Sequence, residues 1–252
     1  MNVIESFNLK GKTALVTGCS KGIGKSMSIA LAEAGANIIG LSSSSNYLEL
    51  KSEVEKLNRT FSYYQVNLDH RNEIYEFLKN IENLTIDILV NNAGTIYRNP
   101  ALNHNDFNWD SILNINLTAP FIITKSIAQQ MLRRNEGKII FTCSLLSFQG
   151  GINVPSYTAS KSALAGLIKS FANEWASKGI CVNGIAPGYI DTDNTFDLRN
   201  DAKRSQSILE RIPTNRWGNP DDFKGPIVFL ASNASNYVNG TILLVDGGWM
   251  GR

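Results

Sequence analysis

Short apolar runs alternate with longer segments of helical periodicity along this chain, and this alternation limits its possible folds more than any other feature. The runs have the length and residue types of buried strands, whereas the segments between them carry apolar residues at a spacing near 3.6. The predicted strands cover residues 12–18, 36–42, 61–67, 86–94, 137–144, 180–188 and 241–248. The predicted helices cover residues 25–35, 47–58, 71–84, 106–135 and 155–178. This alternation predicts a doubly wound α/β fold, in which a parallel sheet carries helices on both faces and the crossovers are right-handed.

The length of the chain is consistent with one such sheet, and its net charge bears on the partners it could bind. The chain has 252 residues, enough for one large core, so we expect a single domain over residues 1–252. The formal net charge is only +2, and acidic and basic residues are interspersed. No nucleic-acid or membrane partner is therefore indicated.

The stretch 188–218 lacks a clear strand pattern, and we interpret it as a partly helical, lid-like segment because long insertions in compact domains are often functional.

Cysteine and histidine usage favours a cytoplasmic protein without a metal. Cys19, Cys143 and Cys181 lie far apart, which is typical of reduced thiols, and His70 and His104 lack the spacing of metal ligands. The N-terminus has no signal-peptide pattern, and no apolar run approaches the ~18 residues that a membrane span requires.

A glycine-rich turn follows the first predicted strand and opens the first predicted helix. Residues 17–24 read TGCSKGIG. Its glycines permit a tight turn close to a pyrophosphate, and free N–H groups at the start of the helix face the anion. The spacing differs from the common G-x-G-x-x-G pattern, but the strand–turn–helix context favours a dinucleotide site.

The end of the second predicted strand lacks the acidic residue that would bind the ribose 2′-hydroxyl of NAD. Four serines follow Leu41, and the first acid is Glu49. Ser42 and Ser43, together with Lys21 from the glycine-rich turn, can face a 2′-phosphate. The residues therefore permit NADP, and NAD stays open as the alternative.

Tyr157 and Lys161 are four residues apart in the stretch SYTASKSAL, so they share one helix face. An ammonium close to a phenol stabilises the phenolate, and we expect it to lower the pKa of Tyr157 from the usual value of about 10. Such a tyrosine can exchange a proton with an alcohol or a carbonyl. Ser144 ends the strand at 137–144, at the sheet edge where ligands bind, and it can polarise the substrate oxygen.

Taken together, these motifs resemble the short-chain dehydrogenase/reductase family along the whole chain. They are TGxxxGIG, NNAG at 91–94, Ser144, YxxxK and the Pro-Gly pair at 187–188. The resemblance implies a Rossmann-type sheet of seven parallel strands, hydride transfer with NADP or NAD, no metal and a homotetramer. It also implies a catalytic tetrad made of Asn116, Ser144, Tyr157 and Lys161.

The same resemblance implies which residues bind the cofactor. They belong to the glycine-rich turn, the ends of the following strands, the Tyr-Lys helix and the segment after the sixth strand. They are Gly18, Ser20, Lys21, Gly22, Ile23, Gly24, Ser42, Ser43, Asn67, Leu68, Asn92, Ala93, Gly94, Tyr157, Lys161, Pro187, Gly188, Ile190 and Thr192.

Within the family, several segments are similar to members that act on keto sugar acids from uronic acid breakdown. They are SFQGGINVPSYTASKS, NEWA, RIPTNRWG, GPIVFLAS and VDGGWMGR. The likeness implies a substrate such as 2-dehydro-3-deoxy-D-gluconate. Its carboxylate would suit an arginine, with Arg98 as the first candidate and Arg204 as the second. Gln149 is a candidate for a sugar hydroxyl, and Ser144 and Tyr157 would face the reacting oxygen.

Two alternatives stay open. With the same chemistry, the protein can instead be a reductase of a 3-oxoacyl thioester or of an alginate-derived uronate, or an enzyme of the gluconate 5-dehydrogenase type. A non-catalytic nucleotide-sensing protein is the other alternative, but such a protein would be expected to lack Tyr157 or Lys161, and both are present.

Overall fold

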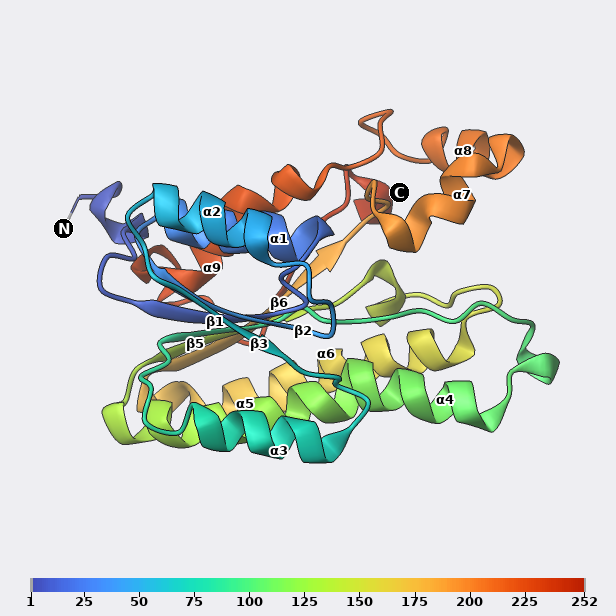
Figure 1. Cartoon of the computed structure of the whole chain (residues 1–252). Helices are drawn as coiled ribbons and strands as arrows, with labels where there is room; N and C mark the ends of the chain where they lie inside the picture. The colour runs from blue at the N-terminus through green and yellow to red at the C-terminus, as the bar shows by residue number, and fades with distance from the viewer. Residues whose placement is uncertain (1, 252) are drawn as a thin grey trace.

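Seven strands form one parallel sheet in the computed structural model of the protein, which describes residues 2–251 (Figure 1). The order across the sheet is β3-β2-β1-β4-β5-β6-β7. The strands are β1 (Thr13–Thr17), β2 (Asn37–Ser42), β3 (Phe61–Gln65), β4 (Ile88–Asn91), β5 (Gly137–Thr142), β6 (Ile180–Pro187) and β7 (Ile242–Val245). The predicted doubly wound, seven-stranded parallel sheet is confirmed.

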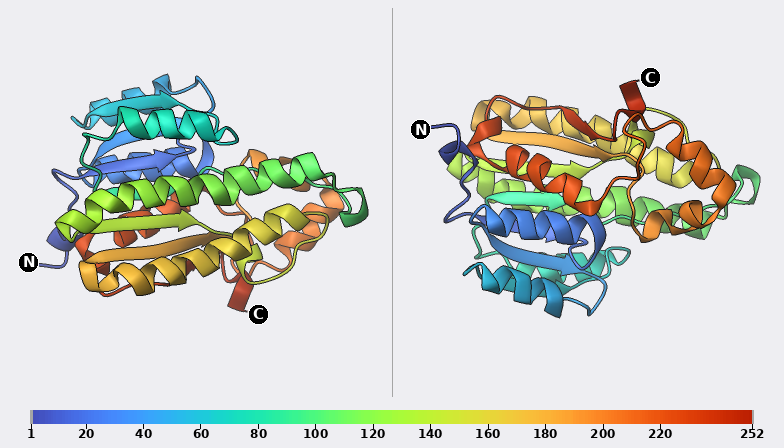
Figure 2. Two further views of the ribbon diagram at one scale, coloured as in Figure 1. Left: turned by 90° about the horizontal axis from the view of Figure 1, so that it is seen from below. Right: turned by 90° about the horizontal axis from the view of Figure 1, so that it is seen from above.

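Helices cover both faces of this sheet (Figures 1 and 2). One face carries α1 (Gly22–Glu33), α2 (Leu48–Lys56) and α9 (Lys224–Ala231). The other carries α3 (Arg71–Asn80), α4 (Asp106–Leu113), α5 (Ala119–Arg134) and α6 (Pro155–Trp175). Successive residues of a strand point to opposite faces, so Leu15 joins the core under α5 and α6 while Val16 joins the core under α1. The sheet is thus buried on both sides, as parallel sheets require.

The helix predicted over 106–135 is interrupted by one π-helical turn. The turn, Asn114–Thr118, lies between α4 and α5 and contains the buried side chain of Asn116. Such a turn is rare and occurs frequently at functional sites. Hydrophobic periodicity alone predicts one continuous helix, because a single π-turn hardly changes the spacing of apolar residues.

The strand order reverses between β1 and β4, and this reversal positions the site. From β1 the chain proceeds outward to β2 and β3, whereas from β4 it proceeds to β5, β6 and β7. A crevice opens at the carboxyl ends of the strands at such a point, and ligands bind there in open α/β sheets. The segment 188–218 contains a 3-10 turn, Asp193–Thr195, followed by α7 (Phe196–Asn200) and α8 (Ala202–Leu209), beyond these strand ends (Figure 1).

Candidate active site

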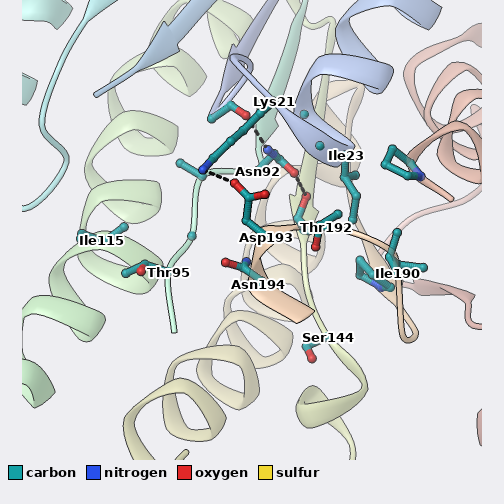
Figure 3. A pocket seen from close by; sticks show the side chains of 18 of the residues that line it. Lys21, Ile23, Asn92, Thr95, Ile115, Ser144, Ile190, Thr192, Asp193 and Asn194 are labelled. Atoms are coloured by element: carbon teal, nitrogen blue, oxygen red, sulfur yellow. Dashed lines mark hydrogen bonds and ion pairs between the residues drawn. The ribbon is translucent and has the colours of Figure 1, made fainter. Parts of the chain in front are cut away.

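A cavity of about 720 Å³ lies at the carboxyl edge of the sheet (Figure 3). All nineteen residues predicted to bind the cofactor line it, and so does Ser144. They come from the glycine-rich turn, the carboxyl ends of β2, β3, β4 and β6 and the residues just after them, α6 and the start of the 188–218 segment. The fold therefore brings together residues that are up to 174 positions apart in the chain, from Gly18 to Thr192.

The glycine-rich turn has the shape that a pyrophosphate requires. Gly18 has φ +66°, and a Cβ atom at this position would lie 2.8 Å from the Cα atom of Ala93. Asn92 fixes the turn, because its Nδ2 atom donates to the carbonyl oxygens of Thr17 (3.1 Å) and Gly18 (3.2 Å). The turn leads into the N-terminus of α1, whose free N–H groups suit an anion. These residues fit a dinucleotide cofactor.

Lys161 is buried at the floor of the cavity, next to Tyr157. Its Nζ atom donates to the carbonyl oxygen of Thr142 at 2.7 Å and lies 5.6 Å from the centre of the Tyr157 ring. A Cβ atom on Gly94 would lie 3.5 Å from this Nζ atom and 3.4 Å from Oδ1 of Asn116. Lys161 and Asn116 thus approach the same glycine, Gly94, and Tyr157 lies beside Lys161.

Burial shifts the pKa values of Lys161 and Tyr157 in opposite directions. It lowers the pKa of Lys161 to about 8, because the ammonium has lost its hydration. It raises the pKa of Tyr157, and a hydrogen bond with Ser144 and the positive charge of Arg98 only partly oppose this shift. The expected lowering of the Tyr157 pKa is therefore wrong for this structure, because desolvation of the phenolate outweighs the nearby positive charge.

Asn116 lies behind the cavity and does not line it. Its amide forms a closed pair with the backbone of Thr95: Oδ1 accepts from the N–H, and Nδ2 donates to the carbonyl oxygen, both at 2.9 Å. Nδ2 also lies 3.2 Å from Oγ of Ser160 on α6. Asn116 therefore ties the segment after β4 to the helix that carries Tyr157 and Lys161.

The predicted substrate residues Arg98, Gln149 and Arg204 also lie outside the cavity lining. Arg98 is exposed at the rim, where Nη2 donates to the carbonyl oxygen of Asn194 at 2.8 Å. Its charge still affects Tyr157, as the pKa of the phenol shows. Arg204 is exposed on α8. Of the two arginine candidates, Arg98 is the one whose side chain donates a hydrogen bond to a residue that lines the cavity.

Arg199 lines the cavity and was not among the predicted site residues. Its Nη2 atom lies 2.7 Å from Oδ1 of Asp191 and donates to the carbonyl oxygen of Thr192 at 3.2 Å. No motif marks this arginine in the sequence. Its only signal is its place in α7, within the stretch 188–218 that the sequence singles out as irregular.

Three further findings concern the whole of residues 2–251. All three cysteines are free and buried. Within this range, no three histidine, cysteine, aspartate or glutamate side chains are grouped so that they could hold a metal ion. No helix in this range has the length and apolar character needed to cross a membrane.

The chain matches known proteins over nearly its whole length. Residues 12–203 match the family described as short chain dehydrogenase. The chain is 57% identical to the 2-dehydro-3-deoxy-D-gluconate 5-dehydrogenase of Pseudoalteromonas atlantica, and the match covers 99% of this chain and 100% of the relative.

Solved structures agree with this match. A candidate 2-deoxy-D-gluconate 3-dehydrogenase from Agrobacterium tumefaciens, with bound NADP, superposes with a TM-score of 0.93 at 44% identity, covering 98% of this chain and 99% of that one. A gluconate 5-dehydrogenase from Burkholderia cenocepacia, in complex with NADP and tartrate, has a TM-score of 0.94 at 34% identity and covers 100% of both chains. The family match and the geometry at the carboxyl edge of the sheet lead to one conclusion: this chain belongs to the short-chain dehydrogenase family and is an oxidoreductase.

Proposed function

We propose that the protein uses NADP or NAD to interconvert a keto and a hydroxy group on 2-dehydro-3-deoxy-D-gluconate or a closely related uronate-derived sugar acid. The observation that carries this proposal is one cavity that joins Ser144, Tyr157 and Lys161 to every residue expected to bind the cofactor. The substrate class is supported by the relative from Pseudoalteromonas atlantica, which is 57% identical and carries the name of this activity.

Each catalytic residue has a distinct part in this proposal. The nicotinamide cofactor, when bound, supplies or accepts the hydride. Tyr157 gives a proton to the substrate oxygen or takes one from it, and the Ser144 hydroxyl donates a hydrogen bond to the same oxygen. Lys161, with a pKa of about 8, exchanges protons in the working range and stabilises a phenolate on Tyr157. Asn116 acts as a positioning residue through its bonds to Thr95.

Arg98 is our first candidate for the substrate carboxylate, Arg204 the second, and Gln149 the candidate for a sugar hydroxyl. The link from Arg98 to Asn194 at the cavity rim favours Arg98. Replacing Arg98 with methionine should raise KM for the sugar acid far more than KM for a neutral carbonyl compound. Arg204→Met provides the matched comparison on α8. If neither substitution changes KM for the acid, the carboxylate is held elsewhere.

A panel of purified substrates tests the substrate class. We expect 2-dehydro-3-deoxy-D-gluconate to give the highest kcat/KM, above D-gluconate, an alginate-derived uronate and an acetoacetyl thioester. A gluconate 5-dehydrogenase activity is the second candidate, and the Burkholderia cenocepacia structure, with 100% coverage of both chains, favours it. A thioester that outperforms every sugar acid would contradict the substrate class, and no turnover with any substrate would favour a nucleotide sensor.

We further propose a cytoplasmic homotetramer of single-domain subunits, each with residues 188–218 as a lid and without a nucleic-acid or membrane partner. Large apolar side chains are exposed on α4 and α5, and a subunit contact would cover them. They are Phe107 (79% exposed), Trp109 and Phe121 (each 38%). Light scattering of the purified protein tests the assembly, and a mass of one subunit, 27.7 kDa, would contradict it.

A further inference from the structure

An ion pair spans the mouth of the cavity. Nζ of Lys21, in the glycine-rich turn, lies 2.5 Å from Oδ2 of Asp193, at the start of the 188–218 segment (Figure 3). Both residues line the cavity, and both side chains are about three-quarters exposed, at 73% and 74%. The pair joins two segments that line the cavity, and its members are 172 positions apart in the chain.

Lys21 starts from the side of the cavity where the adenosine ribose is expected. Its neighbour Ser20 places Oγ 3.0 Å from Oγ of Ser42, at the end of β2. In this fold the ribose 2′ position faces the end of the second strand. The four-carbon stem of a lysine is flexible. The Lys21 ammonium can therefore turn toward the 2′ position or away from it, toward Asp193.

The other positive charges nearby have partners or lie elsewhere. Lys25 on α1 is paired with Glu49 at 2.6 Å. Among residues 2–251, two cationic residues besides Lys21 line the cavity. Lys161 lies at the catalytic end, bonded to the carbonyl oxygen of Thr142, and Arg199 is paired with Asp191. Binding of a phosphate at the end of β2 therefore depends on the charge of Lys21, and in this structure Lys21 is paired with Asp193.

We propose that Asp193 is a specificity-determining residue, because it competes with the 2′-phosphate of NADP for Lys21. A phosphate monoester carries about −1.5 to −2 charges at neutral pH, so its approach either breaks the Lys21–Asp193 pair or brings two anions close together. NAD has a neutral hydroxyl at this position and leaves the pair intact. Asp193 therefore shifts the cofactor preference toward NAD, and the inference rests on the proposed use of both cofactors.

Equilibrium binding of the reduced cofactors to the free enzyme tests this proposal without any sugar acid. We would measure Kd for NADPH and NADH by nicotinamide fluorescence in wild type, Asp193→Asn, Lys21→Met and the double variant. Asp197→Asn is a matched control, because it removes the same charge from the same segment at a residue that does not line the cavity.

Asp193→Asn should raise the preference for NADPH over NADH about two- to fivefold, a modest change because exposed ion pairs are weak. In the Lys21→Met background the same substitution should have no effect on this ratio, and Asp197→Asn should have none in either background. An unchanged ratio in Asp193→Asn would overturn the proposal. An equal increase in the Lys21→Met background would also overturn it, because Asp193 would then act on the phosphate without Lys21. A wrong substrate assignment would leave all these binding ratios unaffected.

Discussion

The rate of alcohol oxidation should rise about fiftyfold between pH 6 and pH 8 and level off above pH 9. The reason is the pair formed by Tyr157 and Lys161 at the floor of the cavity. Burial raises the pKa of the phenol and lowers that of the ammonium to about 8, so the pair loses its first proton near pH 8. Only the pair that has lost this proton can accept one from the alcohol. With a pKa of about 8, about half of the molecules are in this form at pH 8 and about one in a hundred at pH 6, which gives the expected magnitude.

Reduction of the carbonyl needs the protonated pair, so its rate should instead fall above pH 8. Lys161→Arg separates this account from a general pH effect, because a guanidinium stays protonated throughout this range. The variant should lose the inflection near pH 8 in both directions.

The assay is kcat/KM between pH 5.5 and 10, followed by the absorbance of the reduced nicotinamide, with the oxidation and reduction limbs measured separately. An oxidation rate that changes less than threefold between pH 6 and pH 8 would refute the reasoning. An unchanged inflection in Lys161→Arg would show that another group titrates.

Three further substitutions test single contacts. Gly18→Ala should cost about 2 kcal/mol in urea unfolding and weaken cofactor binding, because φ is +66° and the new Cβ atom would approach Ala93 Cα to 2.8 Å. Asn116→Ala should lower both kcat and the free energy of unfolding, the latter by about 2 kcal/mol, since two backbone groups of Thr95 lose their partner. The folded-state pKa of Lys161 lies below its ordinary value of 10.5, so its burial destabilises the fold fully below pH 8 and less as the pH rises toward 10.5. The stability of wild type relative to Lys161→Met should therefore increase by about 1.4 kcal/mol per pH unit between pH 8 and pH 10.5, measured by urea titration.

Much of the fold and the site could be predicted from the sequence because the informative signals are local. The turn at 17–24 and the pair Tyr157 and Lys161 each lie within one short stretch, and the alternation of strands and helices determines which ends of the strands meet. Since the carboxyl ends of parallel strands lie at one edge, the glycine-rich turn and the Tyr-Lys helix had to converge there.

What the sequence did not predict depends on contacts between distant segments. The Lys21–Asp193 pair joins residues 172 positions apart, and Arg199 reaches the cavity only because α7 lies beyond the strand ends. The direction of the Tyr157 pKa shift also depends on how deeply the phenol is buried. Spacing along a helix shows that a lysine is near a tyrosine, but it does not show how much water the fold removes from both.

The most direct test of the central claim compares wild type with Tyr157→Phe in the oxidation of 2-dehydro-3-deoxy-D-gluconate, with NAD and with NADP. The substitution removes only the oxygen that carries the proton, so the variant should bind NADH and NADPH with wild-type affinity. Its kcat should fall at least a thousandfold, within the range that general acid–base catalysis contributes. Turnover within tenfold of wild type, at equal cofactor affinity, would contradict the assignment of Tyr157 as the proton-transferring residue. No oxidation of this sugar acid by wild type with either cofactor would contradict the proposed substrate.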